Sequence, residues 1–279
     1  MGGYRSSLSK TLKAVTGLDL NATDDIGDLM ANFARDKSAI RDLPPPWNLS
    51  LVLEMLTKPP FEPLHTASLK YVTWKTVFLL ALASGKRRSE LHALTNRVIH
   101  HSVKWSKVTL VPETGFLAKT ELVNRPACKS ILTIPALSPI VEASDEPQRK
   151  LCPIRALKVY LQITKAKRGM KRKLFIAHKA NFAGEIHANT ISGWLRKVIT
   201  LAHEDVPEET RTRLRIKAHS IRSVASSWAF QKNVSLQNIM DACSWSSHNT
   251  FTSYYLKDMA LEEEGMFHLG PVVAAQQVV

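Results

Sequence analysis

The chain has 279 residues, of which 44% are hydrophobic, so it is long enough to bury a sizeable core in one or two globular domains. Its 38 lysines and arginines outnumber its 24 aspartates and glutamates, and the resulting formal charge of +14 favours a polyanionic partner such as nucleic acid. Its three widely spaced cysteines argue against a zinc site or a disulfide framework, and no apolar run approaches the roughly 20 residues of a membrane span, so a soluble intracellular protein is expected.

The N-terminal residues predict a small helical unit followed by a boundary. Apolar residues at three- and four-residue spacing indicate two short helices within residues 4–35, with a break near residues 17–25. The run Leu43-Pro44-Pro45-Pro46-Trp47 cannot continue a helix, because successive prolines remove backbone donors and force extended backbone. We therefore expect three parts, which are residues 1–43, residues 44–260 and a C-terminal tail at residues 261–279.

The second part is expected to begin with helices. A helix capped by Asn48 or Ser50 is predicted over residues 51–56. Residues 68–83 are almost continuously apolar and predict a long core helix, which Gly85 ends.

Arg87 lies between that helix and a second helical stretch at residues 89–94, at a corner where a long side chain can leave the core. The hydrophobic period then changes, and alternating residues predict the strands of a small sheet. Lys119 sits in the connection between strands, after Gly115-Phe116-Leu117-Ala118. The strands are expected at residues 103–105, 107–111 and 130–134.

Helical periodicity returns in the C-terminal half of the chain. The dense cationic run from Lys165 to Lys173 is expected to be a loop, which solvation or contact with backbone phosphates explains equally well. The order of elements predicts the α+β class, mainly α with a small antiparallel β-sheet. The later helices are expected at residues 153–164, 190–202, 219–230, 236–242 and 250–259.

The last fifth of the chain concentrates side chains suited to phosphate chemistry. His219 and Arg222 stand at i and i+3 of one predicted helix, so both project from the same face and could serve one phosphate. Trp245 and the pair Tyr254-Tyr255 follow. A His-x-x-Arg match alone is weak, because roughly one random chain in two of this composition contains it.

Covalent cleavage of a phosphodiester needs a nucleophile, positive charge at the non-bridging oxygens and an acid for the departing oxygen. The sequence contains no cluster of carboxylates at metal-ligand spacing, so arginines would have to supply the positive charge. Arginine suits this role because its planar guanidinium stays protonated and can bind two phosphate oxygens at once. Neither a metal nor another cofactor is expected.

Several motifs occur in one order along the chain, namely Ser84-Gly85-Lys86-Arg87-Arg88-Ser89-Glu90-Leu91, Phe116-Leu117-Ala118-Lys119, His219-Ser220-Ile221-Arg222, Trp245 and Tyr254-Tyr255. This pattern resembles the catalytic domain of the tyrosine recombinases, over about residues 47–260. Pro60-Phe61-Glu62-Pro63-Leu64 and the phrase from Trp245 to Phe251 are similar to phrases in recombinases of animal mobile elements of the DIRS, Ngaro and Crypton kinds.

The resemblance implies the tyrosine recombinase catalytic-domain fold, which is the fold of DNA breaking-rejoining enzymes. It implies a site-specific recombinase or integrase that cleaves and rejoins double-stranded DNA through a 3′-phosphotyrosyl intermediate, without metal or ATP. Arg87 and Arg222 would clamp the scissile phosphate, and Lys119 would be the general acid. His219 would assist proton transfer at the tyrosine, and Trp245 would donate its indole N–H or buttress the site. A homotetramer on DNA and action in the nucleus are also implied.

Two tyrosines compete for the role of nucleophile. Counting nine residues from Trp245, as in bacterial and phage members, selects Tyr254. The mobile-element phrase Thr-Phe-x-x-aromatic-Tyr selects Tyr255 instead. Adjacent residues of a helix point about 100° apart, so only one of them can reach the phosphate. We prefer Tyr255, because residues 250–258 follow that phrase throughout, and keep Tyr254 as the alternative.

The short N-terminal part leaves a second function open. Members of the family carry a helical DNA-binding domain before the catalytic one, and residues 1–43 are interpreted as a truncated, SAM-like core-binding remnant of it. The alternative is therefore a DNA-binding protein of the same fold that has lost strand exchange. A type IB topoisomerase uses similar chemistry, but the mobile-element phrases argue against it.

Overall fold

In a computed structural model of the chain, the residues described are 2–19, 28, 32, 45–100, 105–118, 131–137, 146–178, 185–245 and 247–257. The chain divides into two units, residues 1–42 and 43–279. The first unit contains helix α1 (Gly2–Thr16), which confirms a helix ahead of the break expected near residue 17. The second helix predicted in this unit lies almost wholly outside the described residues.

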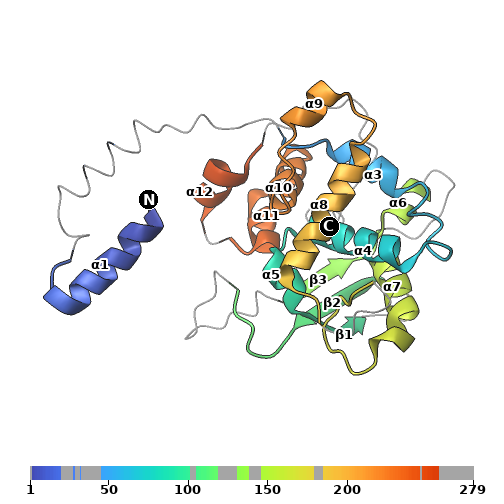
Figure 1. Cartoon of the computed structure of the whole chain (residues 1–279), viewed down its shortest axis with the longest axis horizontal. Helices are drawn as coiled ribbons and strands as arrows, with labels where there is room; N and C mark the ends of the chain where they lie inside the picture. Colours follow the sequence, from blue (N-terminus) through green and yellow to red (C-terminus); the bar gives the residue numbers. More distant parts are fainter. Residues whose placement is uncertain are drawn as a thin grey trace. The chain divides into compact units, whose positions relative to one another are not determined.

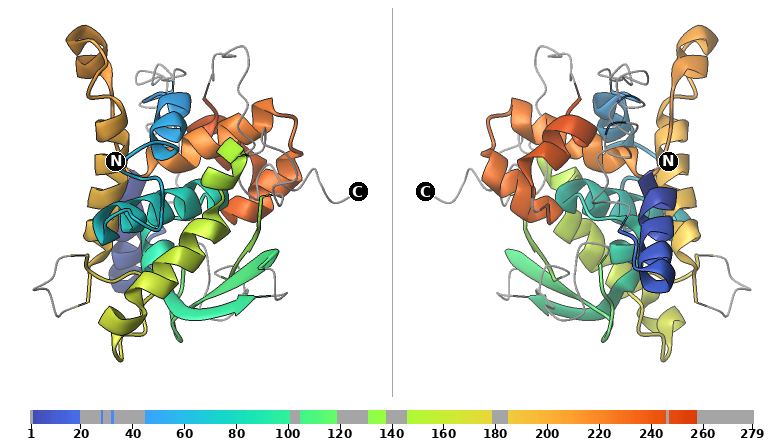
Figure 2. Two further views of the ribbon diagram at one scale, coloured as in Figure 1. Left: turned by 90° about the vertical axis from the view of Figure 1, so that its right-hand side faces the viewer. Right: turned by 90° about the vertical axis from the view of Figure 1, so that its left-hand side faces the viewer.

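The second unit is a helical body with a small sheet (Figure 1). The predicted class, mainly α with an antiparallel β-sheet, is confirmed. The sheet lies at one edge of the helical body (Figure 2). The elements are α3 (Leu49–Leu56), α4 (Leu69–Ser84), α5 (Arg88–Ala93), β1 (Leu94–His100), β2 (Lys107–Pro112), β3 (Leu132–Pro135), α6 (Glu146–Lys150), α7 (Pro153–Arg168), α8 (Ala188–Ala202), α9 (Glu208–Arg213), α10 (Ser220–Gln231), α11 (Leu236–Cys243), α12 (His248–Thr250) and the π-helix η3 (Phe251–Tyr255).

Helix α4 is the centre of the hydrophobic core. Thirteen of its sixteen residues are buried, and it packs against α7, α8 and α10. A helix that is apolar on all sides is stable only when other elements surround it, and this is the position that α4 occupies. The core helix predicted at residues 68–83 is confirmed, and it ends at Gly85 in the left-handed conformation, with φ of +56°.

The residues after the proline run are fixed to α8 and α10. Asn48 caps α3, because its Oδ1 accepts a hydrogen bond of 3.2 Å from the backbone N–H of Leu51. The backbone N–H of Asn48 donates to Nε2 of His203, just beyond α8, at 3.1 Å. Trp47 Nε1 donates to Ser220 Oγ, at the first residue of α10, at 2.8 Å. These bonds hold the start of the second unit against the helix that carries the His-x-x-Arg motif.

The sheet is antiparallel with the strand order β1-β2-β3. Val98 pairs with Leu110, and Thr109 pairs with Thr133. The strands predicted at residues 107–111 and 130–134 are confirmed as β2 and β3, with small shifts of their ends.

The first strand of the sheet was missed, and the strand expected at residues 103–105 is wrong at Trp105, its one described residue. The chain enters β1 at Leu94, directly after α5, whereas the sequence pattern indicated a strand at residues 103–105. Trp105 has φ of +56° and lies outside any strand, and residues 101–104 are not among those described. The register of β1 shifts between Leu94 and Val98, and such an irregularity weakens the alternation that identifies a strand in a sequence.

The cationic run from Lys165 to Lys173 was predicted to be a loop throughout. This prediction is wrong for the start of the run. Lys165 to Arg168 form the last turn of α7, and Gly169 follows that turn. Arg168 is buried, and its guanidinium donates to the backbone oxygens of Lys173 at 2.5 Å and Leu174 at 2.9 Å. Lysine, alanine and arginine favour helix, and cations are stabilised at a helix C-terminus, so the helix continues into the run.

The C-terminal helix predicted at residues 250–259 is shorter and of another type. The chain forms one turn of α12 and then the π-helix η3, in which the N–H of Leu256 donates to the C=O of Phe251 at 2.9 Å. That bond joins residues i and i+5, which is the wide turn of a π-helix. Residues 258–279, with the expected tail, lie outside the described part of the chain.

A buried ion triad fastens the first part of the core. Lys75, on α4, is fully buried and donates to Glu62 Oε1 at 2.5 Å. Arg155, on α7, donates to both carboxylate oxygens of Glu62 at 2.7 and 3.1 Å, and the N–H of Leu64 donates to Oε2 at 3.0 Å. Burial lowers the pKa of Lys75 to about 8, although the hydrogen bond and charge of Glu62 oppose that shift. Glu62 therefore joins the loop after α3 to two core helices.

We expect Glu62→Gln to lower the free energy of unfolding by about 3 kcal/mol, because it leaves the buried ammonium of Lys75 without a counter-charge. Chemical denaturation measures the change. The matched control is Glu54→Gln, which breaks the exposed pair of Glu54 with Lys58 and should cost less than about 1 kcal/mol. Equal costs for the two variants would contradict the role given to the triad.

The contribution of Glu62 should also depend on pH. Burial alone would raise the pKa of Glu62, but hydrogen bonds from Arg155 and Lys75 outweigh burial and lower the pKa from 4.5. The unfolded chain therefore binds more protons near pH 4.5, and the stabilisation is present above this pH and is lost as the pH falls through the folded-state pKa. We expect the difference in unfolding free energy between the unmodified chain and Glu62→Gln to shrink below pH 4.5. A difference that grows on acidification would contradict this sign.

Candidate functional site

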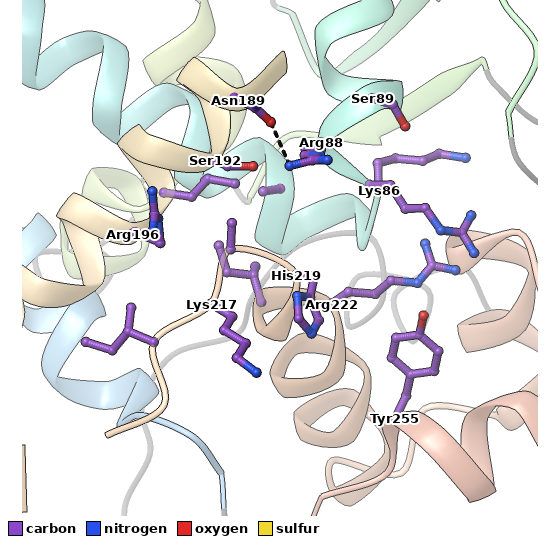
Figure 3. A pocket seen from close by; sticks show the side chains of 16 residues that line it. Lys86, Arg88, Ser89, Asn189, Ser192, Arg196, Lys217, His219, Arg222 and Tyr255 are labelled. Atoms are coloured by element: carbon purple, nitrogen blue, oxygen red, sulfur yellow. Dashed lines mark hydrogen bonds between the residues drawn. The ribbon is translucent and has the colours of Figure 1, made fainter. Parts of the chain in front are cut away.

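A cleft of about 740 Å³ opens between the α4–α5 corner, α8, the start of α10 and the end of η3 (Figure 3). The cleft is strongly positive, since none of the described residues that line it is an aspartate or a glutamate. Arg88 Nη1 donates to Asn189 Oδ1 at 2.8 Å and so joins α5 to α8 across the cleft. The lysines and arginines that line the cleft are Lys86, Arg87, Arg88, Arg196, Lys217 and Arg222.

Arg222 is the buried anchor of the cleft, with 4% of its surface exposed. Its Nη1 donates to the C=O of Gly85 at 2.6 Å, and its Nη2 donates to the C=O of Cys243. Its Cζ lies 4.5 Å from the centre of the Trp245 ring and 5.5 Å from that of the Tyr255 ring. Burial lowers the pKa of Arg222, and the nearby charge of Glu90 opposes that shift. The two carbonyls and the two ring faces add to the stabilisation of the guanidinium in this position.

The α4–α5 corner places Arg87 beside Arg222. Gly85 takes the left-handed conformation that ends α4, and a Cβ atom added to it would lie 2.7 Å from Cys243 Sγ. Glu90 Oε2 accepts a hydrogen bond of 2.8 Å from the backbone N–H of Arg87 and lies 3.7 Å from Arg87 Nη1. Glu90 therefore orients both the backbone and the guanidinium of Arg87.

Lys86 gives the corner a second connection to α11. Its Nζ donates to Ser244 Oγ at 2.8 Å and lies 3.5 Å from Glu90 Oε1, and its side chain is almost fully buried. Burial lowers the pKa of Lys86, while the charge of Glu90 opposes the shift. Ser244 has a positive φ of 54° where α11 ends, so this bond fixes the turn that leads directly to Trp245.

His219 and Tyr255 line the cleft near Arg222. Partial burial of the His219 imidazole and then the charge of Lys217 lower its pKa from 6.5, so the ring is mainly neutral at pH 7 and can accept a proton. Tyr255 ends η3, and its hydroxyl points toward the guanidinium of Arg222 (Figure 3). Tyr254 differs sharply, because it is 78% exposed and is not among the residues that line the cleft.

The structure thus brings together Arg87, His219, Arg222 and Tyr255. Trp245 lies behind them, 5% exposed, with its ring centre 4.6 Å from that of Tyr255. It lines a separate cavity of about 320 Å³ rather than the cleft. Its Nε1 has no hydrogen-bond partner among the described residues, and its face supports Arg222. Lys119 lies outside the described residues.

Two residues of the site were not singled out from the sequence. Lys86 belongs to the motif around Arg87 and had no role assigned to it, yet it is buried and bonded to Ser244. Lys217, two residues before His219, also had no role assigned to it, and it lines the cleft. The signal for Lys217 was its place next to the His-x-x-Arg motif, whereas the sequence held no signal for the burial of Lys86.

Comparison with protein-family models and with curated proteins gave no match for this chain. Within the described residues, no group of three or more His, Cys, Asp or Glu side chains could hold a metal ion. None of the described helices combines the length and the hydrophobicity needed to cross a membrane.

We expect Gly85→Ala to destabilise the fold, through about 1–2 kcal/mol for the left-handed backbone and a further cost from the contact with Cys243 Sγ. Thermal and chemical denaturation of the two single variants, Gly85→Ala and Cys243→Ala, and of the double variant measure the coupling. The double variant should recover the steric part of the cost.

Gly115→Ala is the matched control, because Gly115 also has a positive φ, of +82°, but no atom lies within 4 Å of an added Cβ. It should show the backbone cost alone. Equal losses for Gly85→Ala and Gly115→Ala, with no coupling to Cys243, would show that the close approach at Gly85 has no energetic role.

Proposed function

We propose that this chain is a DNA strand transferase of the tyrosine recombinase kind, which cleaves and rejoins DNA through a 3′-phosphotyrosyl intermediate. The observation that carries the proposal is the convergence of two arginines, a histidine and one tyrosine on a single positive cleft. Arg87 and Tyr255 are 168 positions apart in the sequence (255 − 87). Their meeting is therefore not a consequence of sequence proximity. The resemblance to recombinases of mobile elements extends the proposal to an assembly of four copies on DNA in the nucleus.

The chemistry is a phosphoryl transfer in two steps. In the first step Tyr255 Oη attacks phosphorus, the bond from phosphorus to the 5′ oxygen breaks, and a phosphotyrosyl bond forms. The tyrosine proton passes to His219, and the departing 5′ oxygen receives a proton from a general acid, the role that the resemblance assigns to Lys119. In the second step a 5′ hydroxyl attacks the phosphotyrosine and reverses these bond changes. The bond energy is retained in the intermediate, so no ATP is consumed.

The two arginines would contribute differently. Arg87 lines the cleft and a quarter of its side chain is exposed, so the exposed part of its guanidinium can donate to a non-bridging phosphate oxygen. Arg222 already donates to Gly85 and Cys243, and it would act mainly through its charge, 5.5 Å from the Tyr255 ring. A fixed buried cation in this place stabilises the negative charge that develops in the transition state.

The same hydrogen bonds favour a second candidate, a DNA-binding protein that has lost strand exchange. An arginine that donates to two backbone carbonyls and lies against two rings could be retained for stability alone. In that case the cleft would bind a phosphate through Arg87, Arg88 and Lys217 without chemistry at Tyr255.

The decisive experiment uses a duplex with a nick close to the scissile bond, which prevents religation and traps the intermediate. The full chain, incubated with such duplexes in EDTA, should form a covalent protein–DNA adduct that is stable to denaturing electrophoresis. Tyr255→Phe should abolish the adduct, because it removes the attacking oxygen. Tyr254→Phe is the matched control and should leave the adduct in place, because Tyr254 is exposed and does not line the cleft.

Loss of the adduct in Tyr254→Phe with retention in Tyr255→Phe would reverse the assignment of the nucleophile. If no duplex gives an adduct while salt-sensitive DNA binding persists, the binding protein is the correct function. Arg222→Ala would not separate the two functions, because it would also remove the hydrogen bonds that hold the α4–α5 corner to α11.

A further inference from the structure

A second positive groove, of about 630 Å³, lies between the start of α4 and α8, which pack against each other. Lys70 and Tyr71 line it from the first turn of α4, together with Trp74 one turn later. Arg196 and Lys197 line it from α8. The sequence motifs do not include any of these residues, and the chemistry proposed for the cleft does not use them.

The cations of this groove are arranged around one indole. Lys70 Nζ lies 4.7 Å from the ring centre of Trp74 and 4.7 Å from that of Tyr71. Lys197 Nζ lies 5.6 Å from the ring centre of Trp74 on the α8 side. Trp74 itself is 5% exposed, and its Nε1 has no hydrogen-bond partner among the described residues. A ring face attracts an ammonium without using its N–H donors, so both lysines can still bind an anion.

The cations of this groove are not paired with carboxylates among the described residues, although Glu204 lines the groove. Lys75, Lys86 and Arg155 each pair with a glutamate. The side chains of Lys70, Arg196 and Lys197 form no ion pair or hydrogen bond within the part of the chain that the structure describes. Three cations that gather in one groove without neutralisation repel each other, and an anionic ligand relieves that repulsion.

Arg196 connects this groove to the cleft, because its side chain lines both. A ligand that occupies both sites must therefore carry negative charge on each side of α8. Separate small anions could fill the two sites independently, but a continuous polyanion gains from both, since its second contact is made within the same complex. A phosphodiester strand has this distribution of charge, with a negative group at every nucleotide.

We propose that the Lys70–Trp74–Lys197 groove binds backbone phosphates of the DNA strand that continues from the cleft past Arg196. This inference rests on DNA as the ligand of the cleft, as proposed above, and adds a contact that positions the strand without taking part in the chemistry. Glu204 lines the same groove and is exposed, so its charge opposes a phosphate there and marks the less favourable end.

The test is the salt dependence of binding of the full chain to a fluorescein-labelled duplex of arbitrary sequence, followed by anisotropy. The double variant Lys70→Gln/Lys197→Gln should weaken binding to all duplexes and reduce the slope of log K against log salt by about 1.8, since each lost phosphate contact removes about 0.9. Glu204→Gln should strengthen binding at a fixed salt concentration. Thermal denaturation must show that each variant is folded.

Lys158→Gln is the matched control, because Lys158 is exposed and also lies over an indole, 5.7 Å from the Trp105 ring, but outside the groove. Its slope should equal that of the unmodified chain. An unchanged slope in a folded Lys70→Gln/Lys197→Gln variant would overturn the proposed groove and leave the proposed function standing. A reduced slope in a chain that forms no adduct would support the groove and remove the chemistry. Groove-dependent affinity for poly-L-glutamate, with none for duplex, would overturn the groove as a DNA site and indicate an acidic protein surface instead.

Discussion

The site depends on one interaction, the double hydrogen bond from the Arg222 guanidinium to the carbonyls of Gly85 and Cys243. These carbonyls end α4 and α11, and they come from positions 137 and 21 residues away from the arginine. A buried guanidinium without such acceptors would cost several kcal/mol, so the helix ends must converge on it for the chain to fold. The same convergence brings Arg87 and Tyr255 to one cleft. The requirement that stabilises the core is therefore also the one that assembles the site.

Two small features make this convergence possible. Gly85 leaves room for Cys243 Sγ, which would collide with any larger residue at the end of α4. The bond from Lys86 to Ser244 then fixes the left-handed residue after α11, so the backbone arrives at Trp245 in a single orientation. From there the π-helix carries Tyr255 back over Trp245, with ring centres 4.6 Å apart. A π-turn is less favourable than an α-turn and is often retained at functional sites, which agrees with its place in front of the arginine.

The parts of the fold that could be predicted from sequence are those decided by local pattern. The core helix α4 follows from its apolar run, and the Arg87 corner follows from Gly85. The parts that could not be predicted depend on distant contacts. Lys86 is buried because Ser244, 158 residues away in the sequence, accepts its hydrogen bond, and no local pattern reveals that. At the site, motif order identified the residues that meet in the cleft, but a motif carries no information on burial. For Trp245 the motif left two roles open, donating the indole N–H or buttressing the site, and the ring face of Trp245 lies against Arg222.

The cations of this chain fall into two groups with different physics. Lys75, Lys86 and Arg222 are buried, and each donates to fixed oxygens, so their charges keep one position whether or not a ligand is present. Lys70 and Lys197 lie over the buried ring of Trp74 and line the open groove, so they keep mobile donors, and salt screens their attraction for an anion. Chemistry at a phosphate benefits from the first group, because a preorganised charge needs no rearrangement as the transition state forms. The second group of cations suits a DNA strand that must be held and later released. Many weak, exchangeable contacts give affinity, while no single contact dissociates slowly.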